Sequence, residues 1–257
     1  VMLALAPWPG TAGYGYAFTG RAGGRSRGAF ASLNLSENVG DDPRRVRANW
    51  DVVRASLPDG ARLPRLRQEH GAAVRRAAAG STDLGAADAA FTTEPNVAVS
   101  VLTADCVPIL LCASRAGVVA AVHAGWRGTA ADVVGATVRE IARTCSVVAE
   151  DVAAVLGPAI GPCCYTVGRD VAERLQAVAG DGEGVAVAER NSGAQWDWYA
   201  DLRAVNVALL RRAGVPAGSI HVEGPCTRCA ADDYFSHRAA AGGATGRQAA
   251  LVLKLPT

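Results

Sequence analysis

Short apolar runs separated by polar breaks dominate the middle of the chain. Residues 96–102 (NVAVSVL) and 107–112 (VPILLC) flank a polar break at residues 103–106 (TADC), and residues 117–123 (GVVAAVH) form a third run. Apolar runs of this length are typical of buried strands. The same reasoning predicts further strands at residues 14–19, 152–156, 219–222 and 249–253.

Apolar positions at helical spacing predict a helix that starts near Pro43. Asp42 supplies an N-cap, Pro43 suits the first helical position, and Pro58 ends the pattern. The apolar positions between them are Val46, Trp50, Val53 and Leu57. Three more helices are expected downstream, namely one after the capping-box-like residues 129–132 (TAAD), one at residues 170–179 and one at residues 201–213.

This order of elements predicts an α+β fold. Strands of alternating and of continuously apolar character suggest mixed β-sheets covered by helices on the outside. A single domain over residues 1–257 is expected, because the chain has no internal repeat and residues 180–193 are its nearest approach to a linker.

Composition narrows the class of protein. Half of the residues are hydrophobic and 19% are charged, so the chain has enough apolar side chains for a substantial core. A net charge of +2 and an aromatic content of 5% argue against a nucleic-acid partner. No apolar run approaches membrane-spanning length, and the first residues lack the basic segment of a signal peptide. We therefore expect a soluble, cytoplasmic protein without a membrane partner, whose seven cysteines are reduced thiols.

Polar residues at predicted strand ends are the main candidates for chemistry. Cys106 directly precedes one apolar run, His123 ends another, and His70 lies in the segment QEHG. Two imidazoles and one thiolate suit zinc with a fourth position left for water or substrate, and they equally suit a Cys–His nucleophile pair. The alternative is structural, since a lone cysteine is usually a core residue and a lone histidine is usually hydrogen-bonded scaffolding.

Other candidates depend on weaker patterns. Cys226 and Cys229 have the spacing of a redox or zinc-knuckle pair, but a local turn or incidental thiols is the favoured interpretation. For the adjacent Cys163 and Cys164, packing is favoured. Two arginines are candidates for binding phosphate, namely Arg21 in a glycine-rich loop and Arg127 at the opening of a helix. For Arg21, a solvated basic loop is an equally open interpretation.

Several ordered segments resemble a known family along nearly the whole chain. They include RQEHGAAV (67–74), TADCVPILL (103–111), AAVHAGWRGTA (120–130) and LGPAIGPCCYTVG (156–168). The family is the bacterial laccase-domain or polyphenol oxidase-like family, also described as purine nucleoside phosphorylase and adenosine deaminase-like, or as peptidoglycan editing factor.

The resemblance implies a fold, a site and an activity. It implies a sandwich of mixed sheets with flanking helices, similar to Cys–His hydrolases, in which His70, Cys106 and His123 form a zinc-binding and catalytic trio. The implied activity is phosphorolysis of adenosine, inosine and methylthioadenosine, together with hydrolytic deamination of adenosine, so that the partners are a purine nucleoside and phosphate. Copper competes with zinc for such ligands. A four-copper laccase is disfavoured, because the chain has four histidines and one methionine.

Two other functions remain open from the sequence. In the first, Cys106 attacks a peptide-like carbonyl and His123 relays the proton, as in a metal-free cysteine amidase that edits nucleotide-linked peptidoglycan precursors. In the second, the chain is a non-catalytic scaffold that binds nucleotides.

Overall fold

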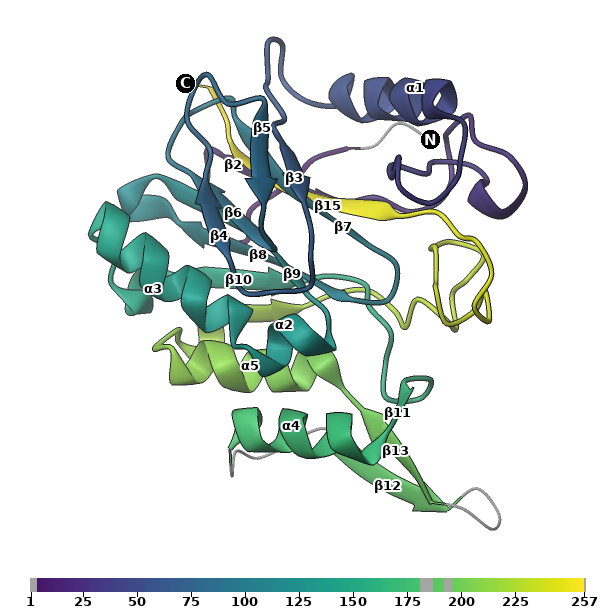
Figure 1. Cartoon of the computed structure of the whole chain (residues 1–257). Coiled ribbons are helices and arrows are strands. Elements are labelled where there is room, and N and C mark those ends of the chain that lie inside the picture. The colour runs from purple at the N-terminus through teal and green to yellow at the C-terminus, as the bar shows by residue number, and fades with distance from the viewer. Residues whose placement is uncertain (1–3, 181–186, 192–195, 257) are drawn as a thin grey trace.

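Two β-sheets packed face to face form the centre of the protein in the computed structural model, which describes residues 4–180, 187–191 and 196–256 (Figure 1). The four-stranded sheet has the order β1 (Ala6–Pro7), β2 (Tyr14–Phe18), β15 (Gln248–Lys254) and β7 (Ala98–Thr103). The six-stranded sheet has the order β14 (Ile220–Val222), β10 (Ala153–Leu156), β8 (Val107–Ala113), β9 (Val118–Ala124), β6 (Ala89–Thr92) and β4 (Val74–Arg76). Antiparallel pairs at its centre and parallel pairs at both edges make this second sheet mixed.

Smaller elements surround the two sheets. The helices are α1 (Pro43–Arg54), α2 (Trp126–Ala130), α3 (Val133–Cys145), α4 (Arg169–Ala179) and α5 (Leu202–Arg212). Short 3-10 helices occupy Gly28–Phe30, Ser114–Ala116, Ala149–Asp151 and Ala217–Ser219. Two small sheets pair β3 (Arg65–Arg67) with β5 (Asp83–Ala86), and β11 (Thr166–Val167) with β13 (Trp196–Ala200) and β12 (Val187–Asn191).

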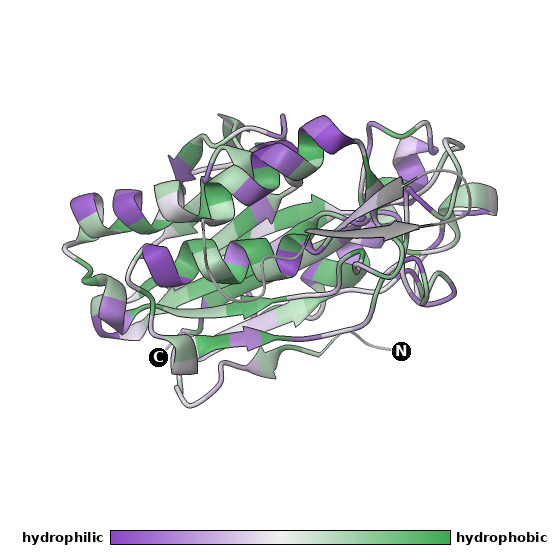
Figure 2. Cartoon of the chain, turned by 90° about the horizontal axis from the view of Figure 1, so that it is seen from below, coloured by the Kyte–Doolittle hydropathy of each residue, from purple (hydrophilic) through white to green (hydrophobic). Residues whose placement is uncertain are grey.

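Alternating side chains of the central strands divide the core into layers. Ile109 and Leu111 of β8 pack beneath α3 and α5, whereas Leu110 of the same strand faces the four-stranded sheet. The outer face of the four-stranded sheet is covered by α1 through Val53. The order of layers is therefore helix, sheet, sheet and helices. Figure 2 shows mainly apolar strands beside helices that carry both polar and apolar residues. The predicted fold, an α+β sandwich of mixed sheets with flanking helices, is confirmed.

Local predictions differ from the structure at three places. Helix α1 ends at Arg54 rather than near Pro58, although Leu57 is still buried. Asp132, not Thr129, caps α3, because its side chain accepts a hydrogen bond from the Gly135 N–H and Thr129 lies inside α2. In the segment 180–193, Val187–Asn191 forms β12 because it pairs with β13, and residues 181–186 and 192–193 lie outside the described residues.

The length and apolar character of the helices decide whether any of them could cross a membrane. Among the described residues, none of the helices combines the length and the apolar character that crossing a bilayer requires.

Candidate functional site

Antiparallel pairing of β8 and β9 brings Cys106 next to His123. Val107 pairs with Ala124 and Pro108 pairs with His123, so Cys106, which directly precedes β8, lies at the same end of the sheet as His123. Side chains alternate along a strand. Position 106 therefore belongs to the same row as Leu110, whose side chain packs between the sheets. The thiol and the imidazole therefore meet at the mouth of the space between the two sheets.

His70 comes to the same place on the loop between β3 and β4. Its backbone φ is 60°, in the left-handed region that few residues other than glycine adopt. The Asp88 carboxylate holds this turn, because it accepts hydrogen bonds from the backbone N–H groups of Glu69, His70 and Gly71 at 3.2, 2.9 and 2.6 Å. The ring centroids of His70 and His123 lie 4.8 Å apart.

Asp88 also orients the second histidine. Its Oδ1 lies 2.8 Å from His123 Nδ1, and its backbone carbonyl accepts from the His123 N–H at 2.7 Å. This contact leaves His123 Nε2 as the ring nitrogen available to Cys106 or to a metal. Asp88 is 1% exposed and His123 is 3% exposed, so the pair is almost fully removed from water. Sequence reasoning missed Asp88, whose only signal is an acidic residue directly before an apolar strand.

Cys106 and His123 shift each other's pKa so that the two side chains carry opposite charges. Burial by itself raises the pKa of Cys106, but the charge of His123 and hydrogen bonds from His123 and His70 lower it to about 6. Burial lowers the pKa of His123, but the Cys106 thiolate and the Asp88 carboxylate raise it to about 9. Burial raises the pKa of Asp88, and its bonds to His123 and to backbone N–H groups outweigh this effect and lower it. Between pH values of about 6 and about 9, Cys106 and His123 thus form a thiolate–imidazolium pair.

The three side chains point at a common volume. One ligand atom from each of His70, Cys106 and His123 lies within 4.8 Å of the others. The exposure increases from the buried His123 through the half-buried Cys106 to the exposed His70. They line a cavity of about 420 Å³, which is in the range of ligand pockets. The other residues that line it include Ser36, Asn38, Gln68, Leu102, His237 and Arg247.

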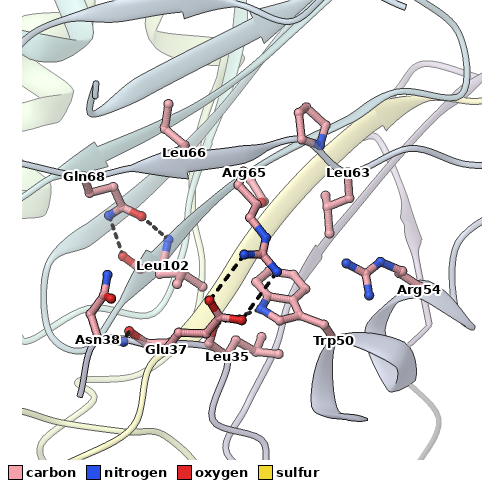
Figure 3. A pocket seen from close by; sticks show the side chains of 13 residues that line it. Leu35, Glu37, Asn38, Trp50, Arg54, Leu63, Arg65, Leu66, Gln68 and Leu102 are labelled. Carbon is pink, nitrogen blue, oxygen red and sulfur yellow. Dashed lines mark hydrogen bonds and ion pairs between the residues drawn. The ribbon is translucent and has the colours of Figure 1, made fainter. Parts of the chain in front are cut away.

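A second, smaller cavity of about 120 Å³ shares one wall with the first (Figure 3). The shared wall contains Gln68 and Leu102, which exchange two hydrogen bonds of 2.8 and 2.7 Å between the amide side chain and the backbone. Figure 3 shows the Arg65 guanidinium paired with the Glu37 carboxylate near Trp50 of α1, with a closest distance of 3.3 Å. The two cavities thus have Ser36, Asn38, Leu66, Gln68 and Leu102 in common among their lining residues.

The side chains of Cys106 and His70 lie so close to the backbone of residue 125 that this position requires glycine. A Cβ atom at this position would lie 3.0 Å from Cys106 Sγ and 3.1 Å from His70 Cδ2. Its backbone, with φ of −74°, is accessible to any residue, so the constraint is the space beside the two side chains. The glycine of the segment HAGWRG thus allows the strand end to approach the thiol and the imidazole.

The two arginines predicted to bind phosphate lie elsewhere. Arg21 donates to the backbone carbonyl of Ala31 at 2.9 Å, and its guanidinium stacks on Phe235 at 4.9 Å. Arg127 stacks on the Trp126 ring at 4.3 Å and lines a cavity between α2 and α4. Neither is among the described residues that line the cavity of the trio, whereas Arg247 is.

The two acidic residues nearest to the trio in sequence also have other contacts. Glu69 pairs with Arg67 at 3.3 Å on the surface. Asp105 is buried with φ of 93°, and its carboxylate accepts from Thr227 Oγ1 and from the Arg238 N–H, both at 2.7 Å. Asp105 therefore positions the turn ahead of Cys106, and neither carboxylate lines the cavity as described.

A thiol and two imidazoles that converge at the mouth of a two-sheet sandwich define a Cys–His site, of the kind that binds a metal ion or activates a nucleophile. Comparison with known families gives this class a more specific assignment. The chain belongs to the family described as multi-copper polyphenol oxidoreductase laccase, whose family model matches residues 15–254.

Individual relatives span most of the chain. A protein named purine nucleoside phosphorylase YlmD from Geobacillus stearothermophilus is 36% identical over 260 residues, which cover 95% of this chain and 91% of the relative. The crystal structure of YlmD covers 96% of this chain and 94% of its own, with a TM-score of 0.88 and 34% identity. A purine nucleoside phosphorylase of Deinococcus radiodurans is 40% identical, covering 92% of this chain and 88% of the relative. A protein named adenosine deaminase RL5, from an unknown prokaryotic organism, is 36% identical, covering 82% and 83%.

Proposed function

We propose that the protein is a zinc-dependent purine nucleoside enzyme that catalyses phosphorolysis of adenosine, inosine and methylthioadenosine, and hydrolytic deamination of adenosine, at the trio of His70, Cys106 and His123. The observation that carries this proposal is the convergence of three ligand atoms within 4.8 Å beside a cavity of about 420 Å³. The names of the relatives supply the class of substrate.

The donor set fits zinc. Tetrahedral zinc, with bonds of about 2.0–2.1 Å to nitrogen and 2.3 Å to sulfur, needs neighbouring ligand atoms about 3.3–3.6 Å apart. The three ligand atoms lie within 4.8 Å of one another, which is close to this separation. The low pKa of Cys106 supplies a thiolate near neutral pH, and the contact of Asp88 with His123 Nδ1 is the carboxylate–histidine arrangement common around zinc. Copper accepts the same ligands, so the ligand set does not by itself identify the ion. Metal analysis of the purified protein distinguishes zinc from copper.

The chemistry divides between the ion and the protein. Bound zinc polarises a substrate oxygen or lowers the pKa of water to about 7. Asp88 fixes His123, Gly125 leaves room for the trio, and the cavity of about 420 Å³ provides space for the nucleoside. In phosphorolysis, a phosphate oxygen forms a bond to ribose C1′ while the bond from C1′ to the base breaks. The base leaves with the electron pair of that bond and takes up a proton from the phosphate or from water. The cavity must therefore bind an anion beside the nucleoside.

Arg67 and Arg247 both line the cavity, and Arg67 pairs with the Glu69 carboxylate, so Arg247 is the guanidinium best suited to hold that anion. It lines the cavity, and burial lowers its pKa below its ordinary value, which indicates a partly desolvated charge. One of its nitrogens donates to the Gly246 carbonyl at 2.9 Å, which leaves other N–H groups available to phosphate.

Substitution distinguishes Arg247 from the arginines predicted from the sequence. We expect Arg247→Met to raise the KM for phosphate by about 10- to 100-fold, because a hydrogen bond to a charged group contributes about 1.5–3 kcal/mol. Deamination in the absence of phosphate should change less. Arg127→Met is the matched control and should leave the KM for phosphate unchanged. The opposite pattern, in steady-state assays with varied phosphate, would assign phosphate binding to Arg127.

Product analysis tests the proposed function directly. Incubation with adenosine and phosphate should yield adenine and ribose 1-phosphate, and incubation without phosphate should yield inosine and ammonia. Both activities should disappear after chelation and return with zinc. Purified protein with zinc bound at the trio that releases neither adenine nor inosine would contradict the proposal.

A cysteine amidase is the second candidate, and the position of Asp88 favours it. Cys106, His123 and Asp88 are arranged as a nucleophile, a base and an orienting carboxylate, with thiolate and imidazolium charges between pH values of about 6 and 9. This enzyme would hydrolyse a peptide-like bond in a nucleotide-linked precursor. Amidase activity that survives chelation and is abolished by iodoacetamide would favour it over the zinc enzyme.

A further inference from the structure

Four cysteines outside the trio meet where two loops leave the six-stranded sheet. Strands β10 and β14 run parallel, with Val155 paired to His221, so the loops that follow them emerge at the same end of the sheet. A parallel bridge between Ala159 and Cys226 continues this pairing into the loops. Cys163 and Cys164 of the first loop thereby lie beside Cys226 and Cys229 of the second.

The four sulfur atoms gather around one point. All four Sγ atoms lie within 4.8 Å of one another, and Cys229 Sγ lies 3.7 Å from that of Cys163 and 3.4 Å from that of Cys164. A disulfide needs about 2.05 Å between its sulfur atoms, and the four thiols are free. Tetrahedral zinc bound by four thiolates, with bonds of about 2.3 Å, separates the sulfur atoms by about 3.8 Å. The observed separations match this arrangement.

We propose that Cys163, Cys164, Cys226 and Cys229 bind one zinc ion as a second, structural metal site, independent of the proposed function. Four protein thiolates complete a tetrahedral shell and leave no position for substrate, which is the property of structural zinc sites. Soft sulfur ligands also select against magnesium and calcium.

The surroundings of the cluster suit bound thiolates. The Gly161 N–H donates to Cys226 Sγ at 3.2 Å, which offsets part of the thiolate charge. A Cβ atom on Gly161 would lie 3.3 Å from Cys226 Cβ and 3.4 Å from Cys163 Sγ, so glycine allows this approach. The same position lies 3.7 Å from a guanidinium nitrogen of Arg203, whose positive charge complements a site with excess negative charge.

The cluster is linked to the catalytic trio through Asp105. Thr227, which lies between Cys226 and Cys229, donates to Asp105 Oδ1 at 2.7 Å. The Ile160 N–H, in the first loop, donates to the Asp105 carbonyl at 2.9 Å. An ion that ties these two loops together therefore stabilises the turn that carries Cys106, although none of the four cysteines lines the cavity as described.

Metal content per chain tests the site. The full chain, purified under reducing conditions with zinc supplied, should lose one equivalent of zinc in Cys226→Ser, and its unfolding midpoint should fall. Cys145→Ser, which removes a thiol outside both clusters, should keep the wild-type content. Cobalt-loaded protein should show the thiolate charge-transfer absorption of a tetrathiolate site, absent in Cys226→Ser and retained in Cys106→Ser. An unchanged zinc content in Cys226→Ser would overturn the proposal.

Thiol labelling of the wild-type chain gives a result even where a variant fails to fold. Cys163 and Cys229 are exposed, so without a metal both should react readily with N-ethylmaleimide. We expect peptide mass spectrometry to find them protected in the zinc-loaded protein and labelled after chelation. Equal labelling in both states, or a disulfide between Cys229 and either Cys163 or Cys164 in the purified protein, would overturn the proposal.

Discussion

Cys106→Ala should remove the metal from the trio and, with it, the turnover of purine nucleosides. Alanine offers no ligand atom, and the two remaining imidazoles lose both the thiolate charge and the third donor. The contribution of a metal to the transition state is several kcal/mol, so we expect kcat/KM for adenosine to fall by about 10³-fold or more. Zinc content should fall by one equivalent per chain, measured on the same preparation.

Cys112→Ala is the matched control for this variant. Cys112 lies on β8, the strand that Cys106 directly precedes, and packs between the sheets, but it is not part of the trio. It should keep its zinc and its activity, even if its unfolding midpoint decreases. Full zinc occupancy with normal rates in Cys106→Ala would contradict the assignment of the trio. Comparing the thermal unfolding of Cys106→Ala with that of Cys112→Ala checks that the first variant folds normally.

The central strands were predictable because both of their faces are buried. Ile109 and Leu111 contact the helix layer while Leu110 contacts the second sheet, and this double burial produces an unbroken apolar run in the sequence. Helix α1 was predictable for a local reason, since the Asp42 carboxylate accepts from the Arg44 N–H and Pro43 follows it.

Elements that depend on distant partners were not predictable in the same way. Strand β12 has a polar sequence, VAERN, and is a strand because β13 pairs with it. The cap of α3 lies at Asp132 because α2 occupies the preceding turn, which residue types alone do not indicate. In both cases tertiary contacts outweigh the local pattern.

The sequence predicted those residues of the site that lie at or next to the ends of apolar strands. Cys106 and His123 stand at the boundaries of apolar runs, and His70 lies in the segment QEHG. The resemblance to a family then united these three candidates as one site. Asp88 and Arg247 reach the site through strand register and loop packing, and Asp88 is 35 residues away from His123 along the chain. The four-cysteine cluster likewise depends on the parallel pairing of β10 with β14, which no spacing of cysteines in the sequence reveals.

Asp88→Asn should weaken zinc binding by about 10- to 100-fold, the usual effect of losing the carboxylate partner of a metal-bound histidine. The Asp88 carboxylate accepts from His123 Nδ1 and from three backbone N–H groups, whereas an amide has one oxygen and a nitrogen that only donates. If the amide oxygen faces His123, the amide nitrogen faces the Gly71 N–H and two donors oppose each other. If the amide is reversed, its nitrogen donates to His123 Nδ1 and the ring proton moves to Nε2, where it blocks the metal.

The measurement separates positioning from folding. Zinc affinity, determined by competition with a chelating dye, should fall much more than the free energy of unfolding of the zinc-free protein, and kcat for adenosine should fall with it. Asp83→Asn is the control, because Asp83 is an exposed carboxylate of β5 that does not contact the trio. Excess zinc should restore part of the activity of Asp88→Asn if Asp88 acts by orienting His123. Unchanged zinc affinity in this variant would instead mean that Asp88 holds only the turn around His70, and that His123 does not depend on it to bind the metal.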